Sequence, residues 1–228
     1  MISFTESPHA VNLVFETVKP DGSIRLIVDA RPANTFFVPP PRVCLPTPEC
    51  LSQLLLAPDQ DLFVAKTDLD NFYHRIKLPL WLHTYFALPG IRVRELDESV
   101  RRDGGLGTHS MDAIVFPCLM SLPMGWSFSV YLAQLAHEYI MYTSGVFSPH
   151  RSLTHADKSP WSLDGVRHLV YIDDVVFFGV DRAQVDRQQR AYTAIIKDSG
   201  LVVKRTKLVT ATADPVKVHE TCFKFRCC

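Results

Sequence analysis

The sequence lacks a charge excess, a cysteine pattern for metal binding and a long hydrophobic run. Lys+Arg and Asp+Glu both number 24 in 228 residues, which disfavours a whole-surface nucleic-acid binder but leaves room for a local basic track. Six cysteines and nine histidines contain no Cys-x-x-Cys and no His-x3–5-His pair near a cysteine, so we expect reduced thiols in an intracellular protein. No apolar run reaches about 18 residues and no signal-peptide pattern opens the chain, so no membrane partner is expected.

Two adjacent carboxylates stand inside one apolar stretch, Leu169–Gly179. Its β-branched and aromatic residues predict two short strands that meet at a tight turn around Asp173 and Asp174. A lone Asp-Asp is also typical of a polar turn. However, two like charges in an apolar setting lose solvation and repel each other, and a divalent cation offsets both effects.

A second acidic cluster, Asp68-Leu69-Asp70, follows a predicted strand at 62–67. Carboxylates at two strand ends are suited to hold the Mg²⁺ or Mn²⁺ ions of a two-metal phosphoryl-transfer site. We therefore expect Asp68 and Asp173 to be bridging ligands and Asp174 to be a third.

Local patterns around these carboxylates predict an α+β fold, with a sheet covered by helices on one face. Asp21-Gly22 predicts a turn between strands near 11–18 and at 23–29, and five prolines exclude a helix interior at 38–48. The other expected elements are a helix from Thr47 through Leu56, an insertion or long hairpin at 90–111, a helix capped by Ser127 that runs to Ser144, a helix from Asp181 to Ser199 and a strand at 201–203. In the helix that ends at Ser144, the apolar spacing predicts burial of Val130, Leu132, Ala133, Leu135, Ala136, Tyr139 and Ile140.

Five motifs, in order along residues 23–208, are similar to those of reverse transcriptases. Tyr171-Ile172-Asp173-Asp174 resembles the Tyr-x-Asp-Asp box of that family, and residues 67–76 resemble its first catalytic motif. Residues 121–127 resemble its Leu-Pro-x-Gly-x segment, and residues 25–34 resemble a fingers strand that ends in Asp-x-Arg-x-x-Asn. Gly200 followed by Lys207 is similar to the motif after the catalytic hairpin. The ordered set is far more specific than any single motif.

The resemblance implies an RNA-directed DNA polymerase: a nucleotidyltransferase that extends a primer 3′-hydroxyl with deoxynucleoside triphosphates on an RNA or DNA template. It implies a polymerase palm with an antiparallel sheet, a partial fingers region and Mg²⁺ or Mn²⁺ as cofactor. The implied catalytic residues are Asp68, Asp173, Asp174 and Lys207, and the implied metal ligands are Asp68, Leu69, Asp173 and Asp174. The implied nucleotide-binding residues are Arg25, Leu69, Asp70, Asn71, Phe72, Tyr73, Met124 and Gly125. Among these, Arg25 would contact the triphosphate, and Tyr73 would block a 2′-hydroxyl.

The same resemblance implies a domain order along the chain. It assigns 1–66 to the fingers, 67–89 to the palm with the first catalytic motif, 90–116 to an insertion or fingers hairpin, and 117–228 to the palm. The sequence ends where a helical thumb would begin, and no RNase H or integrase signature is present. We therefore expect a retrotransposon-type segment of a longer polyprotein, whose other parts would include a thumb and RNase H, integrase or endonuclease domains, or else a truncated retroelement copy.

Several residues depart from the family pattern and leave alternatives open. Met124 stands where many relatives have glutamine, Asn71 replaces an acid of retroviral members, and no primer grip is recognisable at 219–225. The insertion at 90–111 argues against a close retroviral relative. One alternative is an RNA-dependent RNA polymerase, although such enzymes usually carry Gly-Asp-Asp. The other is a catalytically inactive or domesticated domain that only binds nucleic acid.

Overall fold

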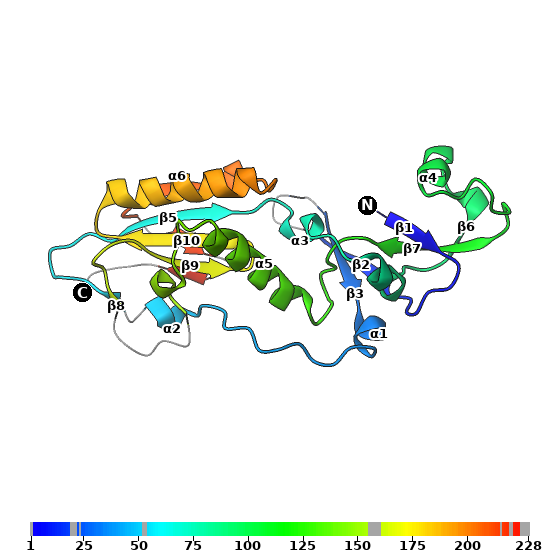
Figure 1. Ribbon diagram of the computed structural model, residues 1–228, viewed down its shortest axis with the longest axis horizontal. Coiled ribbons are helices and arrows are strands. Elements are labelled where there is room, and N and C mark those ends of the chain that lie inside the picture. The colour runs from blue at the N-terminus through cyan, green and yellow to red at the C-terminus, as the bar shows by residue number, and fades with distance from the viewer. Residues whose placement is uncertain are drawn as a thin grey trace. The chain divides into compact units, whose positions relative to one another are not determined.

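The computed structural model describes residues 2–18, 22, 24–51, 54–154, 161–214, 216–218 and 221–223 (Figure 1). The chain folds into two compact units, each built from two separate stretches of sequence. The first unit comprises residues 1–41 and 73–129, and the second comprises residues 42–72 and 130–228. These boundaries differ from the predicted domain boundaries, and the assignment of segments to fingers and palm stays a prediction.

The first unit contains a three-stranded antiparallel sheet with the strand order β1-β7-β6. Its strands are β1 (Ile2–Thr5), β6 (Ile91–Arg92) and β7 (Ile114–Leu119). Between β6 and β7 the chain forms η2 (Val93–Glu95) and α4 (Glu98–Asp103). Val93, Leu106 and Val115 are buried together, so the segment predicted as an insertion has a small apolar core of its own.

A separate hairpin in the first unit confirms the predicted pair of strands before residue 30. Strands β2 (Leu13–Val18) and β3 (Ile24–Asp29) pair in antiparallel register. Residues 19–21 and 23, which include part of the predicted turn, lie outside the described residues. The unit also contains α1 (Arg31–Asn34) and η1 (Leu80–Phe86).

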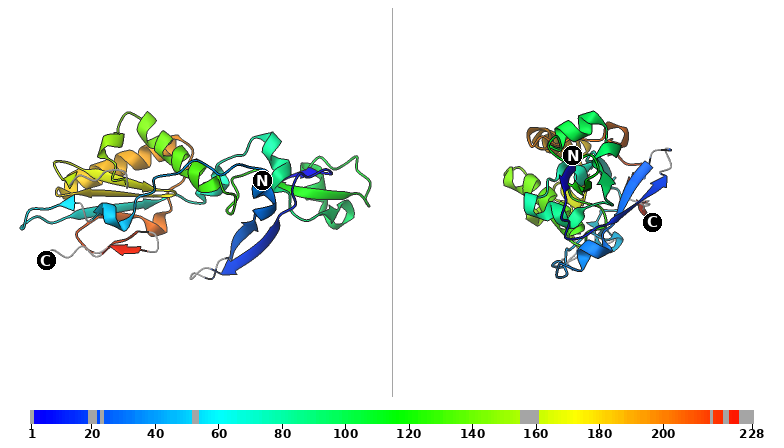
Figure 2. Two further views of the ribbon diagram at one scale, coloured as in Figure 1. Left: turned by 90° about the horizontal axis from the view of Figure 1, so that it is seen from below. Right: turned by 90° about the vertical axis from the view of Figure 1, so that its right-hand side faces the viewer.

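The second unit is built on a four-stranded sheet with the order β11-β5-β10-β9. Its strands are β5 (Phe63–Asp68), β9 (Arg167–Tyr171), β10 (Asp174–Gly179) and β11 (Val209–Thr212), and every neighbouring pair is antiparallel. Helices α5 (Ser129–Thr143) and α6 (Arg182–Asp198) lie on one face of this sheet (Figure 2). The expected antiparallel sheet with helices on one face is therefore confirmed.

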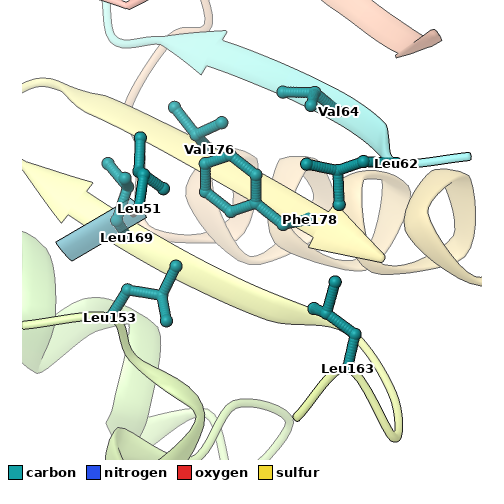
Figure 3. Close-up of a cluster of buried hydrophobic side chains, with 8 residues drawn as sticks. All are labelled: Leu51, Leu62, Val64, Leu153, Leu163, Leu169, Val176 and Phe178. Carbon is teal, nitrogen blue, oxygen red and sulfur yellow. The ribbon is translucent and has the colours of Figure 1, made fainter. Parts of the chain in front are cut away.

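The sheet face turned away from these helices carries an apolar cluster of eight buried residues (Figure 3). The strands contribute Val64, Leu169, Val176 and Phe178, and the surrounding segments contribute Leu51, Leu62, Leu153 and Leu163. Alternate residues of a strand share a face, so Lys66 and Asp68 of β5 lie on the same face as Val64. By the same alternation Asp174 shares the face of Val176. Asp68, Asp174 and Lys66 thus stand at one end of a sheet face that is apolar along the rest of β5 and β10.

Two predicted elements are shorter in the structure than the sequence indicated. The helix expected from Thr47 through Leu56 is only α2 (Pro48–Leu51), because Leu54–Leu55 form β4 and pair with β8 (Trp161–Ser162). The strand expected at 201–203 is an isolated bridge between Leu69 and Val203. Further short elements among the described residues are α3 (Phe72–Arg75), η3 (Pro149–Arg151), η4 (Arg205–Lys207), β12 (Val216–Val218) and β13 (Thr221–Phe223).

The ends of α6 agree with the sequence, whereas α5 differs in its start and its buried face. Asp181 caps α6 by accepting hydrogen bonds from the backbone N–H groups of Ala183 and Gln184. Helix α5 begins at Ser129 rather than directly after Ser127. Tyr139 is 70% exposed and Leu135 is 42% exposed, so their predicted burial is wrong.

Two polar side chains share the buried face of α5 with Ala133 and Met141. Gln134 and His137 are fully buried, because both bond to the backbone of the neighbouring hairpin, as described below. Hydrophobic spacing alone cannot identify such positions, since it treats each polar side chain as solvent-facing. None of the helices in the described ranges is long and apolar enough to cross a bilayer.

Candidate active site

The two adjacent aspartates lie at a tight turn between β9 and β10, as the sequence predicts. Tyr171 pairs with Asp174, which leaves Ile172 and Asp173 as the turn. Ile172 has a φ of 57°, a left-handed conformation that is strained for a β-branched residue. Asp174 also stands directly opposite Asp68 on β5. The turn therefore delivers two carboxylates next to the third.

Side chains of α5 hold this strained turn through both backbone groups of Ile172. The Ile172 N–H donates to Gln134 Oε1 at 2.8 Å, and Gln134 Nε2 donates to the Val170 carbonyl at 3.0 Å. The Ile172 carbonyl lies 2.8 Å from Nδ1 of His137. The Asp173 carbonyl accepts from the Leu69 N–H at 2.9 Å, which joins the turn to the end of β5.

Burial and mutual repulsion disfavour charge on the carboxylates of the turn. Burial, together with repulsion from the nearby Asp174 and Asp68 carboxylates, raises the pKa of Asp173 to about 6. Burial also raises the pKa of Asp174, and a hydrogen bond from Lys66 opposes that shift. Both shifts have the sign expected where like charges converge in a poorly solvated site.

Each carboxylate of the opposed pair is bonded to its own lysine. Lys66 Nζ lies 2.9 Å from Asp174 Oδ2, with only 8% and 5% of the two side chains exposed. Lys207 Nζ lies 2.8 Å from Asp68 Oδ2, but its side chain is 55% exposed. The Asp68 hydrogen bond raises the pKa of Lys207, so this ammonium group keeps its proton at neutral pH.

Lys66 is a site residue that sequence reasoning missed. The available signal was a lysine in an apolar strand, two residues before Asp68 and therefore on the same strand face. A buried lysine requires a paired acid, and the opposing hairpin supplies Asp174. A buried lysine in this strand and an Asp-Asp turn in the neighbouring hairpin together indicate an ion pair between Lys66 and one of the two aspartates.

The predicted position of Lys207 depends on a backbone connection rather than on a regular strand. The Asp70 N–H donates to the Val202 carbonyl at 2.7 Å, and the Lys204 N–H donates to the Asp68 carbonyl at 2.8 Å. The segment before η4 therefore runs beside the end of β5. This attachment places Lys207 next to Asp68, and its predicted catalytic role stays a prediction.

The arrangement fits a divalent cation only with a rearrangement of Lys207. Asp174 Oδ1 is buried and has no hydrogen-bond partner among the described residues, and Asp173 experiences repulsion from its acidic neighbours. A cation would give the buried Asp174 oxygen a partner and would weaken the repulsion between Asp173 and its acidic neighbours. Within the described ranges, however, no group of three or more His, Cys, Asp or Glu residues is arranged to hold a metal ion. A cation at Asp68 would require the largely exposed Lys207 side chain to leave Asp68 Oδ2.

The residues after Asp68 include two buried side chains that are predicted to contact nucleotide. Leu69 and Phe72 are both almost completely buried, and the Phe72 ring packs edge-on against His137 with centroids 5.6 Å apart. Their backbones, rather than their side chains, are the parts suited to contact a ligand. Asn71 has a φ of 52° and donates to the Asp70 carboxylate at 3.1 Å.

In the first unit, Gly125 is required by a close approach between two protein segments. It has a φ of 119°, and a Cβ at this position would overlap the carbonyl oxygen of Val28. The Val28 N–H donates to the Met124 carbonyl at 3.2 Å. Asn34 donates to the Gly125 carbonyl at 3.2 Å and accepts from the Ser127 N–H at 2.9 Å. The motif at residues 25–34 and the motif at residues 121–127 are thus joined by direct hydrogen bonds.

The predicted site residues are divided between the two units. The second unit brings together Asp68, Asp173, Asp174 and Lys207, and it contains Leu69, Asp70, Asn71 and Phe72 directly after Asp68. The first unit contains Arg25, Tyr73, Met124 and Gly125. Tyr73 is half-buried in α3, and the Arg25 side chain lies outside what the structure describes.

A sequence profile described as "Reverse transcriptase (RNA-dependent DNA polymerase)" matches residues 17–225. The chain belongs to the reverse transcriptase family. Among curated proteins, none matches the sequence. Several solved structures are similar to this reverse transcriptase-family chain.

Reverse transcriptases of foamy viruses share its fold at low sequence identity. A foamy viral protease-reverse transcriptase solved with double-stranded DNA matches with a TM-score of 0.57 and 15% identity, covering 88% of this chain and 27% of the viral chain. The prototype foamy virus protease-reverse transcriptase CSH mutant matches with a TM-score of 0.61 and 16% identity, covering 98% of this chain and 24% of the viral chain. The native prototype foamy virus protease-reverse transcriptase matches with a TM-score of 0.58 and 16% identity, covering 94% of this chain and 22% of the viral chain. The chain therefore spans about a quarter of these viral proteins.

Proposed function

We propose that this chain is the fingers–palm region of an RNA-directed DNA polymerase. The observation that carries the proposal is the placement of Asp68 opposite Asp174, with Asp173 in the adjoining strained turn. Three carboxylates at the meeting point of β5 and the β9–β10 hairpin match the motif order of the family. The proposed reaction is nucleotidyl transfer from a deoxynucleoside triphosphate to the 3′-hydroxyl of a primer.

In this proposal the carboxylates of Asp68 and Asp173 bind divalent cations, with the Leu69 carbonyl as a further oxygen ligand. Bound Mg²⁺ or Mn²⁺ supplies activation of the primer hydroxyl and charge neutralisation on the triphosphate. Asp174 would be the third carboxylate ligand through Oδ1, which has no hydrogen-bond partner among the described residues, while its Oδ2 stays paired with Lys66. Buried Leu69 and Phe72 support the backbone beneath the triphosphate.

Lys207 has a role in the proposal that its exposure supports. Its side chain is 55% exposed and its ammonium group is bonded to Asp68 Oδ2, so it can swing from that oxygen to a departing pyrophosphate. There it would neutralise the leaving group and donate a proton from Nζ. The nucleotide contacts of Arg25, Tyr73, Met124 and Gly125 stay predictions that rest on the motifs.

Primer extension by the protein expressed from its complete reading frame tests the proposal. We expect Mg²⁺-dependent extension of a DNA primer on an RNA template, with deoxynucleotides preferred over ribonucleotides. The Tyr73→Ala variant should lose that preference, because the aromatic ring is proposed to block the 2′-hydroxyl. A wild-type preference for ribonucleotides would identify an RNA polymerase instead. Binding of primer–template without any product would identify a non-catalytic nucleic-acid-binding domain.

A further inference from the structure

One buried histidine contacts two segments that carry predicted catalytic motifs, and it also contacts helix α6. His137 of α5 is fully buried, with Nδ1 at 2.8 Å from the Ile172 carbonyl oxygen and Nε2 at 2.7 Å from the Tyr192 hydroxyl. Its ring also packs against Phe72, four residues after Asp68. Tyr192 of α6 is itself fully buried. The motif resemblance assigned no role to either His137 or Tyr192.

The contacts of His137 determine which of its ring nitrogens carries the proton. The Ile172 carbonyl can only accept a hydrogen bond, so Nδ1 must be protonated. Burial lowers the pKa of His137 to about 4, so the ring is neutral at pH 7 and Nε2 is an acceptor. The Tyr192 hydroxyl therefore donates to Nε2. Tyr192 thus stabilises the one neutral tautomer that can bond to Ile172.

The bonded carbonyl belongs to the residue whose backbone is strained. Ile172 has a φ of 57° and directly precedes Asp173. A left-handed β-branched residue persists only where its surroundings hold it. Gln134 satisfies the N–H of this residue and His137 satisfies its carbonyl. Loss of the His137 bond would remove the hydrogen-bond partner of a partly buried carbonyl at the most strained point of the turn.

We propose that His137, with its tautomer fixed by Tyr192, is a positioning residue that holds the Ile172–Asp173 turn and so places the Asp173 carboxylate beside Asp68. This inference rests on the proposed function of the site. His137 touches no reacting atom, so its effect is transmitted through the backbone of the turn. The alternative is a buried histidine that contributes only to folding.

Four variants separate these two roles. His137→Leu removes both hydrogen bonds, whereas His137→Asn keeps an amide donor near the Nδ1 position and can still bond to Ile172. Tyr192→Phe removes only the hydroxyl that fixes the tautomer. Met141→Ala is the matched control, because Met141 is fully buried in the same helix, one turn after His137, and truncation leaves a cavity. Thermal unfolding of each variant establishes how far it is destabilised.

Two readouts do not require polymerase activity. In protein labelled with ¹⁵N-histidine, the ring shifts of His137 should show a protonated Nδ1 and an unprotonated Nε2, and Tyr192→Phe should mix the two tautomers. Mn²⁺ affinity, measured by electron paramagnetic resonance without nucleotide, should be weaker in His137→Leu than in Met141→Ala. His137→Asn should retain most of the wild-type affinity.

Kinetics complete the test. We expect His137→Leu to lower kcat by roughly 10–100-fold, with little change in the KM for nucleotide, while Met141→Ala keeps the wild-type kcat. Equal kcat and equal Mn²⁺ affinity in these two variants, at equal thermal midpoints, would overturn the proposal, as would a ring protonated on Nε2. If the wild type extends no primer, the proposed function fails, but the ring shifts and the Mn²⁺ affinities still decide the role of His137.

Discussion

Asp68 and Asp174 stand directly opposite each other on β5 and β10, and each carboxylate is bonded to a different lysine. The two lysines differ in exposure, because the Lys66 side chain is buried and the Lys207 side chain is largely exposed. Asp174 is therefore paired with a cation that is shielded from solvent, whereas the partner of Asp68 can leave that carboxylate without being pulled out of the protein interior. Asp173 adds a third carboxylate, which neither of these two ion pairs includes.

The first prediction concerns the buried ion pair. Lys66→Met should destabilise the protein by about 3–5 kcal/mol, because it leaves the Asp174 carboxylate buried without its partner. Urea unfolding at pH 7 in the presence of a chelator measures this loss. The double variant Lys66→Met with Asp174→Leu should recover most of the lost stability, since it removes both charges together. A Lys66→Met protein as stable as the wild type would show that the pair is not buried as described.

The second prediction follows from the raised pKa of Asp173. The folded value of about 6 exceeds the reference value of 3.8, so the folded protein binds more protons than the unfolded chain between these values. The contribution of Asp173 to stability is present below pH 4 and is lost as the pH rises through 6. Asp173→Asn should therefore be more stable than the wild type at pH 7.5 by about 1–3 kcal/mol in metal-free buffer.

The comparison between variant and wild type isolates this effect. Burial lowers the pKa of His137 to about 4, so His137 contributes an opposite trend, with stability rising between pH 4 and 6.5. That trend is common to both proteins and cancels in their difference. Unfolding free energies at pH 5 and pH 7.5 give the result. A difference that does not grow with pH would contradict the described environment of Asp173.

The third prediction concerns Gly125 in the first unit. Gly125→Ala should destabilise this unit by about 2–4 kcal/mol, because the added Cβ overlaps the Val28 carbonyl at a φ that side chains rarely adopt. Gly107→Ala is the control, since a Cβ there meets open space and its φ is not positive. Chemical denaturation followed by intrinsic tryptophan fluorescence, to which Trp126 of this unit contributes, compares the two variants. Equal stabilities would show that Gly125 is not needed for the contact with β3.

The sequence predicted the parts of the site that depend on local pattern. The alternation around Asp173 identified the hairpin, because apolar residues on both sides of an acidic turn pair as strands. The capping residue Asp181 and the positive φ of Gly200 delimit α6 as expected. The motif order predicted that Asp68 and the Asp173-Asp174 pair lie at strand ends that meet, but it did not predict that Asp174 is the residue directly opposite Asp68.

The interactions that the sequence did not reveal join polar side chains to distant backbone groups. Gln134 and His137 are buried because the Ile172 turn presents an N–H and a carbonyl to α5, and these groups exist only once the hairpin is docked. Leu135 and Tyr139 are exposed for the same reason, since the helix is rotated to present its polar residues. Hydrophobic periodicity cannot anticipate a buried face that is selected by hydrogen bonding.

The most direct test of the central claim is Mg²⁺-dependent primer extension by the wild type, Asp173→Asn and Asp198→Asn, all expressed from the complete reading frame. Asp198 lies exposed at the end of α6 and serves as the matched control. We predict that Asp173→Asn gives no metal-dependent product, while Asp198→Asn extends the primer as the wild type does. Extension by Asp173→Asn at the wild-type rate would contradict the assignment of this turn as the metal-binding half of a polymerase site.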